Sequence, residues 1–383
     1  MRRAVVICVS LALVLGLPLL GVLLLTGEPL GRYLEFPPRT NYVQHEPFSW
    51  PVFIALAFLI ALIVGPVLLR IARTNLRPSP PLTQHSGPNT QSCRSFPWWG
   101  WLGIGWTGLW WVVAWSRFPW LAAVQEHTFT PLWLGYIVTV NAATFARTGR
   151  CMMLHRPRYC LSLFPLSAAF WWMFEYLNRF VQNWYYVGVV EVSPLEYIVR
   201  AMLPFSTVLP AVLGTAELLT SYPAVSAGMD QFRPIRLYNK KQVSWSLLML
   251  ACLGLVTIGR WPNYLFPLVW IGPLLLTVSL QELAGGATVL SSLAQGDWRD
   301  VWIPALAAFT CGFFWELWNW KSLAHWEYAI PFVHRFQVFE MPLLGYAGYL
   351  PFGLECVVVA DLWLSRQDSA TQDNPITNDG SHQ

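Results

Sequence analysis

Charged side chains are scarce in this sequence. Asp, Glu, Lys and Arg make up 11% of its 383 residues, whereas soluble globular domains carry about 25%. Hydrophobic residues make up 55%, and several runs approach the roughly 20 apolar residues that cross a bilayer. A soluble fold of this length would still need a charged surface. The composition therefore predicts an all-α integral membrane protein with many spans.

Paired cysteines and nucleotide- or metal-binding motifs are also missing. The seven cysteines form no C-x-x-C pair, and no H-x-x-H or H-E-x-x-H spacing occurs, so we expect no metal and no other cofactor. No G-x-x-x-x-G-K-[ST], G-x-G-x-x-G or G-x-S-x-G motif supports nucleotide-driven transport or a serine hydrolase. The net charge of +4 is spread over many loops, so we expect no nucleic-acid partner.

Ten apolar segments are long enough to be candidate transmembrane helices. The predicted spans are 4–25, 50–69, 98–116, 131–146, 161–178, 201–222, 243–259, 265–284, 301–319 and 342–364. The first could be a signal peptide, but its apolar stretch is long and no A-x-A cleavage site follows, which favours a retained helix.

The distribution of basic residues predicts the orientation. With the N-terminus in the cytoplasm, 16 of the 24 Lys and Arg residues fall on cytoplasmic loops and eight fall outside. Because positive residues concentrate on the cytoplasmic side, we expect both termini to be cytoplasmic. We expect the bacterial inner membrane as the location.

The domain organisation follows from the spans and from changes in composition. We predict a two-helix unit with an outer loop over 1–73, a Pro/Ser-rich cytoplasmic linker over 74–97 and a basic cytoplasmic loop over 223–242. Two membrane repeats occupy 98–222 and 243–364, and a polar tail, expected to be disordered, follows over 365–383.

The repeats are predicted from landmarks that occur twice in the same order. The first copy contains Arg117-Phe118-Pro119, Trp133, Glu175-x-x-Asn178 and Trp184-x-Tyr186; the second contains Arg260-Trp261-Pro262, Trp270, Glu316-x-x-Asn319 and Trp326-x-Tyr328. Four spans in each copy imply parallel repeats related by an axis along the membrane normal. The alternative is convergent composition, because Trp-rich segments are common at membrane interfaces.

Each repeat carries a glutamate inside an apolar segment. Glu175 and Asn178, like Glu316 and Asn319, are three residues apart and share a helix face. A carboxylate in hydrocarbon is costly, so this face should point between helices or into a wet cavity. We predict Glu175 and Glu316 as an acid–base pair that the asparagines orient. The alternative is that both pairs are interhelical hydrogen-bond contacts without catalytic use.

The aromatic clusters supply the rest of the predicted site. Trp184, Tyr186, Trp326 and Tyr328 follow the two Glu-x-x-Asn pairs, and their rings could stabilise a developing cation. A second candidate lies in residues 336–355, where several Pro and Gly residues should interrupt the last helix. Glu340 and Glu355 flank this break, as at a transporter's ion site.

The outer loop over 33–50 contains Pro37, Pro38, His45 and Glu46. It is too rich in proline to be regular and too apolar to be a solvated linker. We therefore expect it to fold over the outer face as a lid.

The stretches 184–199 and 326–345 resemble the lycopene cyclase domain of carotenoid-forming membrane proteins. The resemblance consists of a W-x-Y cluster followed by Pro and Glu, here Pro194 and Glu196 in the first stretch and Glu340 and Pro342 in the second. It implies tandem membrane repeats that cyclise polyenes by proton transfer without redox turnover. Both stretches lack the family's double Glu, and the second reverses its order. The chain also resembles Trp-rich, multi-span bacterial membrane proteins.

Three functions remain open from the sequence. The first is a site facing the outer leaflet for a hydrophobic, lipid- or isoprenoid-like molecule, with non-redox acid–base chemistry such as a cyclase or isomerase performs. The second is an ion-coupled transporter or channel, and the third is a structural or assembly subunit of a membrane complex. Membrane lipids and a hydrophobic small molecule are the expected partners; the sequence names no protein partner.

Overall fold

A computed structural model describes residues 2–76, 94–188 and 192–364 of the chain. Most of the predicted Pro/Ser-rich linker, Glu191 and the predicted disordered tail from Gln367 onward lie outside the described residues. The long helices are α1 (Arg2–Leu25), α3 (Trp50–Leu76), α4 (Trp98–Trp115), α6 (Phe129–Thr148), α8 (Pro157–Val181), α9 (Pro194–Phe205), α10 (Val208–Thr220), α11 (Lys240–Thr257), α13 (Leu268–Leu283), α14 (Arg299–Asn319) and α15 (Tyr349–Trp363).

Short elements connect these helices. The short α-helices are α2 (Leu30–Leu34), α5 (Ala122–Gln125), α7 (Met152–His155) and α12 (Pro262–Leu265), and the 3₁₀ helices are η1 (Pro119–Leu121), η2 (Pro223–Ser226), η3 (Ser291–Gln295) and η4 (Leu343–Gly348). The strands are β1 (Trp184–Val187), β2 (His325–Tyr328), β3 (Gln337–Val338) and β4 (Met341–Pro342), and they form two two-stranded sheets.

Seven helical segments in the described part of the chain are long and apolar enough to cross a membrane. They are 2–25, 50–76, 129–148, 157–181, 194–220, 299–319 and 343–363. The helix α13 is apolar but shorter, with 16 residues. On α3, Ile54, Phe58 and Leu62 are 60%, 69% and 61% exposed. A continuous exposed apolar face of this kind suits lipid rather than water, so the helices indicate an integral membrane protein.

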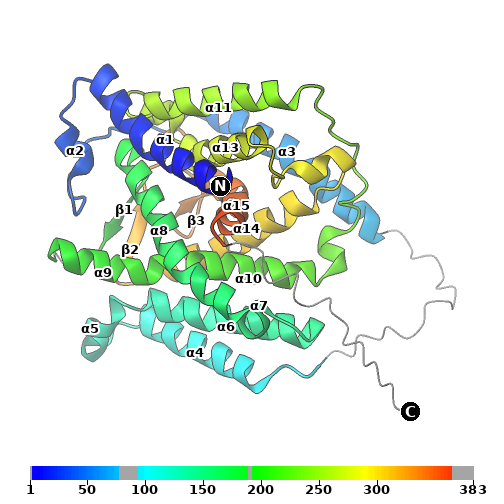
Figure 1. The fold of residues 1–383 in the computed structure, drawn as a ribbon. Coiled ribbons are helices and arrows are strands. Elements are labelled where there is room, and N and C mark those ends of the chain that lie inside the picture. The colour runs from blue at the N-terminus through cyan, green and yellow to red at the C-terminus, as the bar shows by residue number, and fades with distance from the viewer. Residues whose placement is uncertain (1, 77–93, 189–191, 365–383) are drawn as a thin grey trace, which may run out of the picture.

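The helices pack as two hairpins on either side of a central group. Figure 1 shows α4 and α6 along one edge and α11 with α13 along the opposite edge, with α8, α10, α14 and α15 between them. Within this centre α15 approaches α14 closely, because a Cβ on Gly353 would lie 2.1 Å from the carbonyl oxygen of Pro304. Small residues permit such close helix contacts inside membranes.

The last span is interrupted where its sequence predicts a break. Met341 and Pro342 form strand β4, residues 343–348 form the 3₁₀ helix η4, and the regular helix α15 begins only at Tyr349. Proline lacks the N–H group that a continuing helix needs and its ring clashes with the preceding turn. The predicted interruption is therefore present before Tyr349, whereas Pro351 and Gly353 lie inside the regular helix α15.

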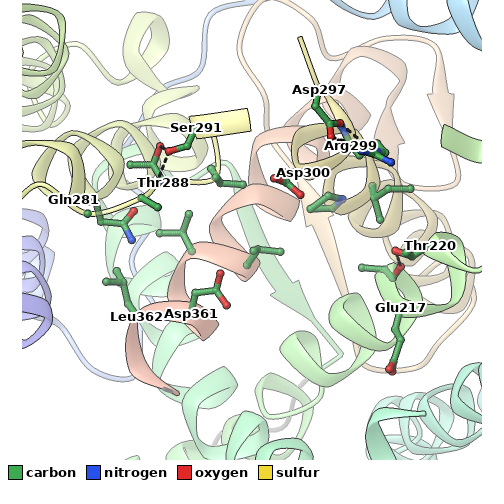
Figure 2. A pocket seen from close by; sticks show the side chains of 18 of the residues that line it. Glu217, Thr220, Gln281, Thr288, Ser291, Asp297, Arg299, Asp300, Asp361 and Leu362 are labelled. Atoms are coloured by element: carbon green, nitrogen blue, oxygen red, sulfur yellow. Dashed lines mark hydrogen bonds and ion pairs between the residues drawn. The ribbon is translucent and has the colours of Figure 1, made fainter. Parts of the chain in front are cut away.

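A polar cavity of about 1,250 Å³ lies at the end of the molecule where Arg2, Arg150 and Arg299 gather. Figure 2 shows its wall, to which α10 contributes Glu217 and Thr220, α13 contributes Gln281, and α15 contributes Asp361 and Leu362. Arg156 and Arg299 at the starts of α8 and α14 line this cavity, whereas the strands β1 and β2 follow the other ends of these two helices. The molecule therefore has a polar cavity at one end and an aromatic ribbon toward the other.

Candidate functional site

The two aromatic clusters pair with each other as an antiparallel ribbon. Trp184 lies opposite Tyr328, Tyr185 opposite Glu327, and Tyr186 opposite Trp326. The tryptophan of each cluster thus faces the tyrosine of the other. Residues about 140 positions apart in the sequence meet in one short sheet. Tryptophans that merely gather at a membrane interface would not need to pair in this way.

The two asparagines of the predicted site hold this ribbon. The side-chain amide of Asn178 donates to the carbonyl of Trp184 (2.8 Å), and its oxygen accepts from the backbone N–H of Asn183 (2.8 Å). Asn319 donates to the carbonyl of Trp326 (2.7 Å) and accepts from the N–H of the same residue (2.8 Å). Each asparagine therefore positions the backbone that carries the aromatic rings, and these bonds go to that backbone rather than to the glutamate that the asparagine was predicted to orient.

Glu175 is buried on α8, with 8% of its surface exposed. One carboxylate oxygen accepts three hydrogen bonds, from the indole N–H of Trp171 (3.0 Å), the indole N–H of Trp184 (3.1 Å) and the hydroxyl of Tyr186 (2.6 Å). Hydrogen bonds from three donors stabilise the ionised form of a carboxyl group. These bonds offset part of the cost of burying an ionised Glu175.

Glu316 has a related but different environment on α14. The side chain is fully buried, and one carboxylate oxygen accepts from the hydroxyls of Tyr328 (2.7 Å) and Tyr349 (2.6 Å). The indole of Trp326 reaches the Tyr328 hydroxyl (2.7 Å) instead of the acid. Within the described residues the second oxygen, Oε2, is buried without a partner. A neutral acid with its proton on Oε2 suits this asymmetry, because an unpaired buried charge is costly.

A glycine explains why Tyr349 reaches Glu316. On α8, the residue four positions before Glu175 is Trp171, which contacts this acid. On α14, the residue four positions before Glu316 is Gly312, which has no side chain to contact the acid. A Cβ on Gly312 would lie 2.4 Å from the ring of Tyr349. The missing side chain leaves space for Tyr349, so the donor to Glu316 comes from α15 rather than from the helix of the acid.

The rings around both acids line one cavity of about 190 Å³. Its aromatic wall is formed by Phe129, Trp171, Trp184, Tyr186, Phe205, Trp270, Trp315, Trp326, Tyr328 and Tyr349. The two carboxylates lie behind this wall, because they bond the hydroxyl and indole groups of the rings. The cavity is smaller than the roughly 300–1,000 Å³ of typical ligand sites, so it fits one ring or one short branched segment of a larger molecule.

The hydroxyl groups of the ribbon keep their protons. The pKa of Tyr186 lies well above its ordinary value, first because of burial and then because of the charge of Glu175. First burial and then the neighbouring carboxyl group of Glu316 raise the pKa of Tyr328. A hydrogen bond to Glu327 (2.7 Å) raises the pKa of Tyr185 to about 12. These tyrosines therefore remain hydrogen-bond donors over the physiological pH range.

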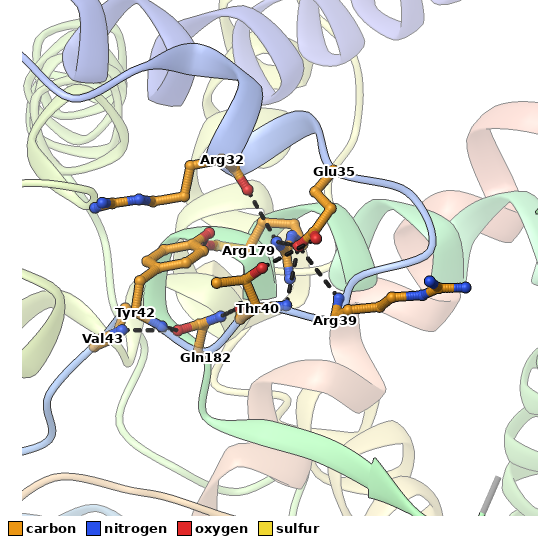
Figure 3. Close-up of polar contacts among 8 residues, drawn as sticks. All are labelled: Arg32, Glu35, Arg39, Thr40, Tyr42, Val43, Arg179 and Gln182. Atoms are coloured by element: carbon orange, nitrogen blue, oxygen red, sulfur yellow. Dashed lines mark hydrogen bonds and ion pairs between the residues drawn. The ribbon is translucent and has the colours of Figure 1, made fainter. Parts of the chain in front are cut away.

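The outer loop docks on the end of α8, as Figure 3 shows. The side-chain oxygen of Gln182 accepts from the N–H groups of Tyr42 and Val43 (2.8 Å each), and its amide donates to the carbonyl of Thr40 (2.8 Å). Gln182 has φ 49°, a left-handed conformation that turns the chain out of the helix. Residues 40–43 of this loop are therefore packed on the end of α8.

The outer loop also covers a polar cavity that is separate from the aromatic cavity and smaller than the polar cavity at the other end of the molecule. Pro37, Arg39 and Asn41 line a cavity of about 230 Å³ together with Glu175 and Tyr186. Glu35 anchors this part of the loop by accepting from the N–H of Thr40 (3.0 Å), and Arg179 contacts the same carboxylate (3.5 Å). Glu175 therefore lies between the polar space under the loop and the aromatic wall.

The structure separates Glu340 from Glu355. Glu340 lies in the turn between β3 and β4, on the same side as the ribbon, and its charge contributes to the raised pKa of Tyr185. Glu355 is 3% exposed and lies within α15, where it lines a cavity with α1 and α13. These two acids flank the helix break in sequence but line no common cavity among those described.

The residues that carry the cyclase resemblance have other contacts. Pro194 is the first residue of α9, and the N–H of Glu196 donates to the Ser193 hydroxyl (3.3 Å), as at a capped helix start. The carboxylate of Glu196 pairs with Arg200 (2.6 Å), which also pairs with Glu126 (3.0 Å). Pro342 belongs to β4.

Six wall residues were not predicted from the sequence: Phe129, Trp171, Phe205, Trp270, Trp315 and Tyr349. For Trp171 a signal existed, since it precedes Glu175 by four residues and shares its helix face. Trp270 had been noted as a repeat landmark only. Nothing in the sequence connects Tyr349 to Glu316, because the contact depends on the packing of α15 against α14.

Comparison of the chain with known protein families, with curated proteins and with solved structures finds no match. The functional conclusion therefore rests on the geometry of the cavity and of the two acids behind it.

Proposed function

We propose that the chain crosses the membrane ten times and contains two parallel repeats, 98–222 and 243–364. The correspondence of contacts supports this. Glu175 bonds Tyr186 as Glu316 bonds Tyr328, and both Glu-x-x-Asn helices hold a strand of the same ribbon. The register of β1 and β2, in which each tryptophan faces the other strand's tyrosine, is the one that a two-fold axis through the Tyr185–Glu327 pair produces.

Both termini are assigned to the cytoplasm of a bacterial cell, with the protein in the inner membrane. Arg2, Arg3, Arg150, Arg156 and Arg299 line the same large cavity. All five belong to the basic residues that the positive-inside rule assigns to the cytoplasmic side. The ribbon and the outer loop then face the opposite side of the membrane.

The proposed function is the binding of a hydrophobic molecule from the lipid phase in the aromatic cavity. One observation carries it: a cavity of about 190 Å³ has aromatic walls whose polar edges bond two buried carboxylates. Aromatic faces attract positive charge, and negative charge on Glu175 behind the rings strengthens this attraction. The cavity is therefore suited to a polyene or isoprenoid segment that carries or develops a positive charge.

The two acids differ enough to divide acid and base roles. Glu175 accepts three hydrogen bonds on one oxygen, whereas Glu316 accepts two and leaves Oε2 unpartnered. Environments that favour different protonation states are typical of acid–base pairs. Because the acids lie behind the wall, proton transfer to a bound molecule would pass through the hydroxyls of Tyr186, Tyr328 or Tyr349. Non-redox isomerisation or cyclisation is the reaction class that this arrangement supports.

The test compares the small molecules that copurify with gently solubilised wild-type protein and two variants. Ala324→Phe places a ring in the cavity, since Ala324 lines it. Val199→Phe adds the same ring at a position on α9 that is 55% exposed. We expect a specific hydrophobic molecule, identified by mass spectrometry, with wild type and Val199→Phe, and at least a tenfold loss with Ala324→Phe. The same bulk phospholipids in all three samples would refute the binding function.

A second comparison tests the acids. Glu175→Gln and Glu316→Gln should change the chemical structure or the amount of the bound molecule. Glu327→Gln is the matched control, because Glu327 lies on the same ribbon and bonds Tyr185 on its exposed side. An unchanged molecule in all three variants would reduce both buried glutamates to structural contacts.

A further inference from the structure

Glu355 occupies a cavity of its own, apart from the aromatic site. The cavity measures about 60 Å³ and lies between α1, α8, α13 and α15. Ser10 on α1 and Thr277 on α13 are the other polar side chains that line it, and the rest of the lining is apolar. Glu355 is 3% exposed. A carboxyl group is thus placed deep between membrane-spanning helices.

Neither carboxylate oxygen of Glu355 has a hydrogen-bond partner among the described residues, and the hydroxyl of Ser10 is also unpartnered. Arginine or lysine does not line this cavity. An ionised carboxylate without a partner is expensive in an apolar interior. The group therefore holds a proton when the cavity is dry, and can release it only where water or another acceptor enters.

Water can come from the large polar cavity at the cytoplasmic end. Val358 and Leu362 line both that cavity and the small cavity of Glu355. Figure 2 shows Leu362 and Asp361 on α15 at the polar cavity. Two apolar side chains on one helix therefore separate Glu355 from a polar space of about 1,250 Å³.

An aromatic layer closes the other direction. Phe352, one turn before Glu355, is fully buried and stacks on Phe170 with ring centroids 5.8 Å apart. Its ring also contacts Trp270 (5.8 Å), which lines the aromatic cavity. Tyr349, one turn before Phe352 on α15, donates a hydrogen bond to the carboxyl group of Glu316. Glu355 is therefore next to the aromatic site but separated from it by packed rings.

We propose that Glu355 is a proton-binding site that exchanges its proton with the polar cavity on the cytoplasmic side. Glu355 is the titratable residue of the small cavity, and Cys356, its neighbour on α15, is the other titratable group in its electric field. No charged residue of α1, α8 or α13 lines the small cavity. This proposal holds whether or not the aromatic cavity binds a hydrophobic molecule, so the two can fail independently.

Dicyclohexylcarbodiimide tests the proposal on the intact protein in detergent or nanodiscs. The reagent enters apolar sites and adds to a protonated carboxyl group: the acid's O–H adds across an N=C bond, and the acyl group then shifts to nitrogen, with no leaving group. Mass spectrometry of the peptide that contains Glu355 measures the adduct. We expect labelling at Glu355 in sodium-free buffer, and at least a tenfold lower rate in alkaline buffer than at pH 6. Glu355→Gln should abolish the adduct on this peptide.

Two neighbouring variants test the route. Val358 lines both cavities, whereas Val357 lines only the large one. After a change of pH, the labelling rate at Glu355 should reach its new value at least fivefold more slowly in Val358→Phe than in wild type. Val357→Phe should leave this time unchanged. Thermal denaturation of both variants shows whether each is folded, and the wild-type result stands without them.

Three results would overturn the proposal. An unlabelled Glu355 peptide that is otherwise detected would mean that the acid is not protonated and reachable. Labelling that does not change with pH would mean that the proton does not exchange. Protection by sodium at constant pH would mean that the cavity binds a cation rather than a proton.

Discussion

Replacing Tyr349 with Phe tests how the protein holds Glu316. The substitution removes one hydroxyl that donates to the buried carboxylate (2.6 Å) and leaves the ring in place. Tyr328 then remains as the donor to the same oxygen, while Oε2 already lacks a partner within the described residues. We therefore expect the whole loss of this hydrogen bond to appear as a lower free energy of unfolding.

The expected magnitude depends on the charge of Glu316. Interhelical hydrogen bonds between membrane helices average about 0.6 kcal/mol and reach about 1.7 kcal/mol, and bonds to a charged group contribute about 1.5–3 kcal/mol. A neutral Glu316 therefore predicts a coupling energy of about 0.6 kcal/mol with Tyr349, and an ionised one about 1.5 kcal/mol or more. The asymmetry of its two oxygens leads us to expect the lower value.

A double-mutant cycle measures this coupling. It compares wild type, Tyr349→Phe, Glu316→Leu and the double variant by reversible unfolding in SDS-containing micelles. The matched control is Tyr346→Phe, because the hydroxyl of Tyr346 donates to the backbone carbonyl of Val338 (3.0 Å). Its coupling to Glu316→Leu should stay within about 0.5 kcal/mol of zero.

Equal coupling of Tyr349 and Tyr346 to Glu316 would contradict this expectation. That result would mean that the Tyr349 hydroxyl is not held by the acid. A coupling above about 1.5 kcal/mol would keep the contact but assign a charge to Glu316, which would exchange the proposed acid and base roles.

Three further predictions concern other parts of the site. Gly312→Ala should destabilise the protein by about 1–3 kcal/mol, since its Cβ would lie 2.4 Å from the ring of Tyr349. The control Gly105→Ala should not destabilise it, because nothing lies within 4 Å of the new Cβ. Equal unfolding free energies for the two variants would contradict this prediction. Asn319→Ala should cost about 1–3 kcal/mol by leaving the backbone of Trp326 unpaired, and hydrogen exchange at β2 should rise. The backbone N–H of Thr40 lowers the pKa of Glu35 below its ordinary 4.5. The contribution of Glu35 to loop docking is therefore present above pH 4.5 and lost as the pH falls below it. Hydrogen exchange at residues 36–43 should rise at low pH, and Glu35→Gln should remove that pH effect.

Composition and apolar run length are enough to predict the medium around this protein and its main helices. Few charges and long apolar runs leave lipid as the surrounding medium, and apolar helices follow because lipid cannot satisfy backbone groups. Pro342, Gly345 and Gly348 mark the part of the last span that is not a regular α-helix. Glu175 and Glu316, with their aromatic clusters, could be selected because polar groups in apolar segments are expensive and must find partners.

The partners of these polar groups depend on how the helices pack in three dimensions. The ribbon brings Trp184 and Tyr328 together across 144 positions of sequence, and no local pattern specifies such a pairing. Gly312 and Tyr349 meet because α15 packs on α14, so the donor to Glu316 could not be read from its own helix. For the same reason Glu340 and Glu355, close in sequence, lie in separate environments: the helix break directs one to a turn and the other between helices, where packing alone decides what surrounds it.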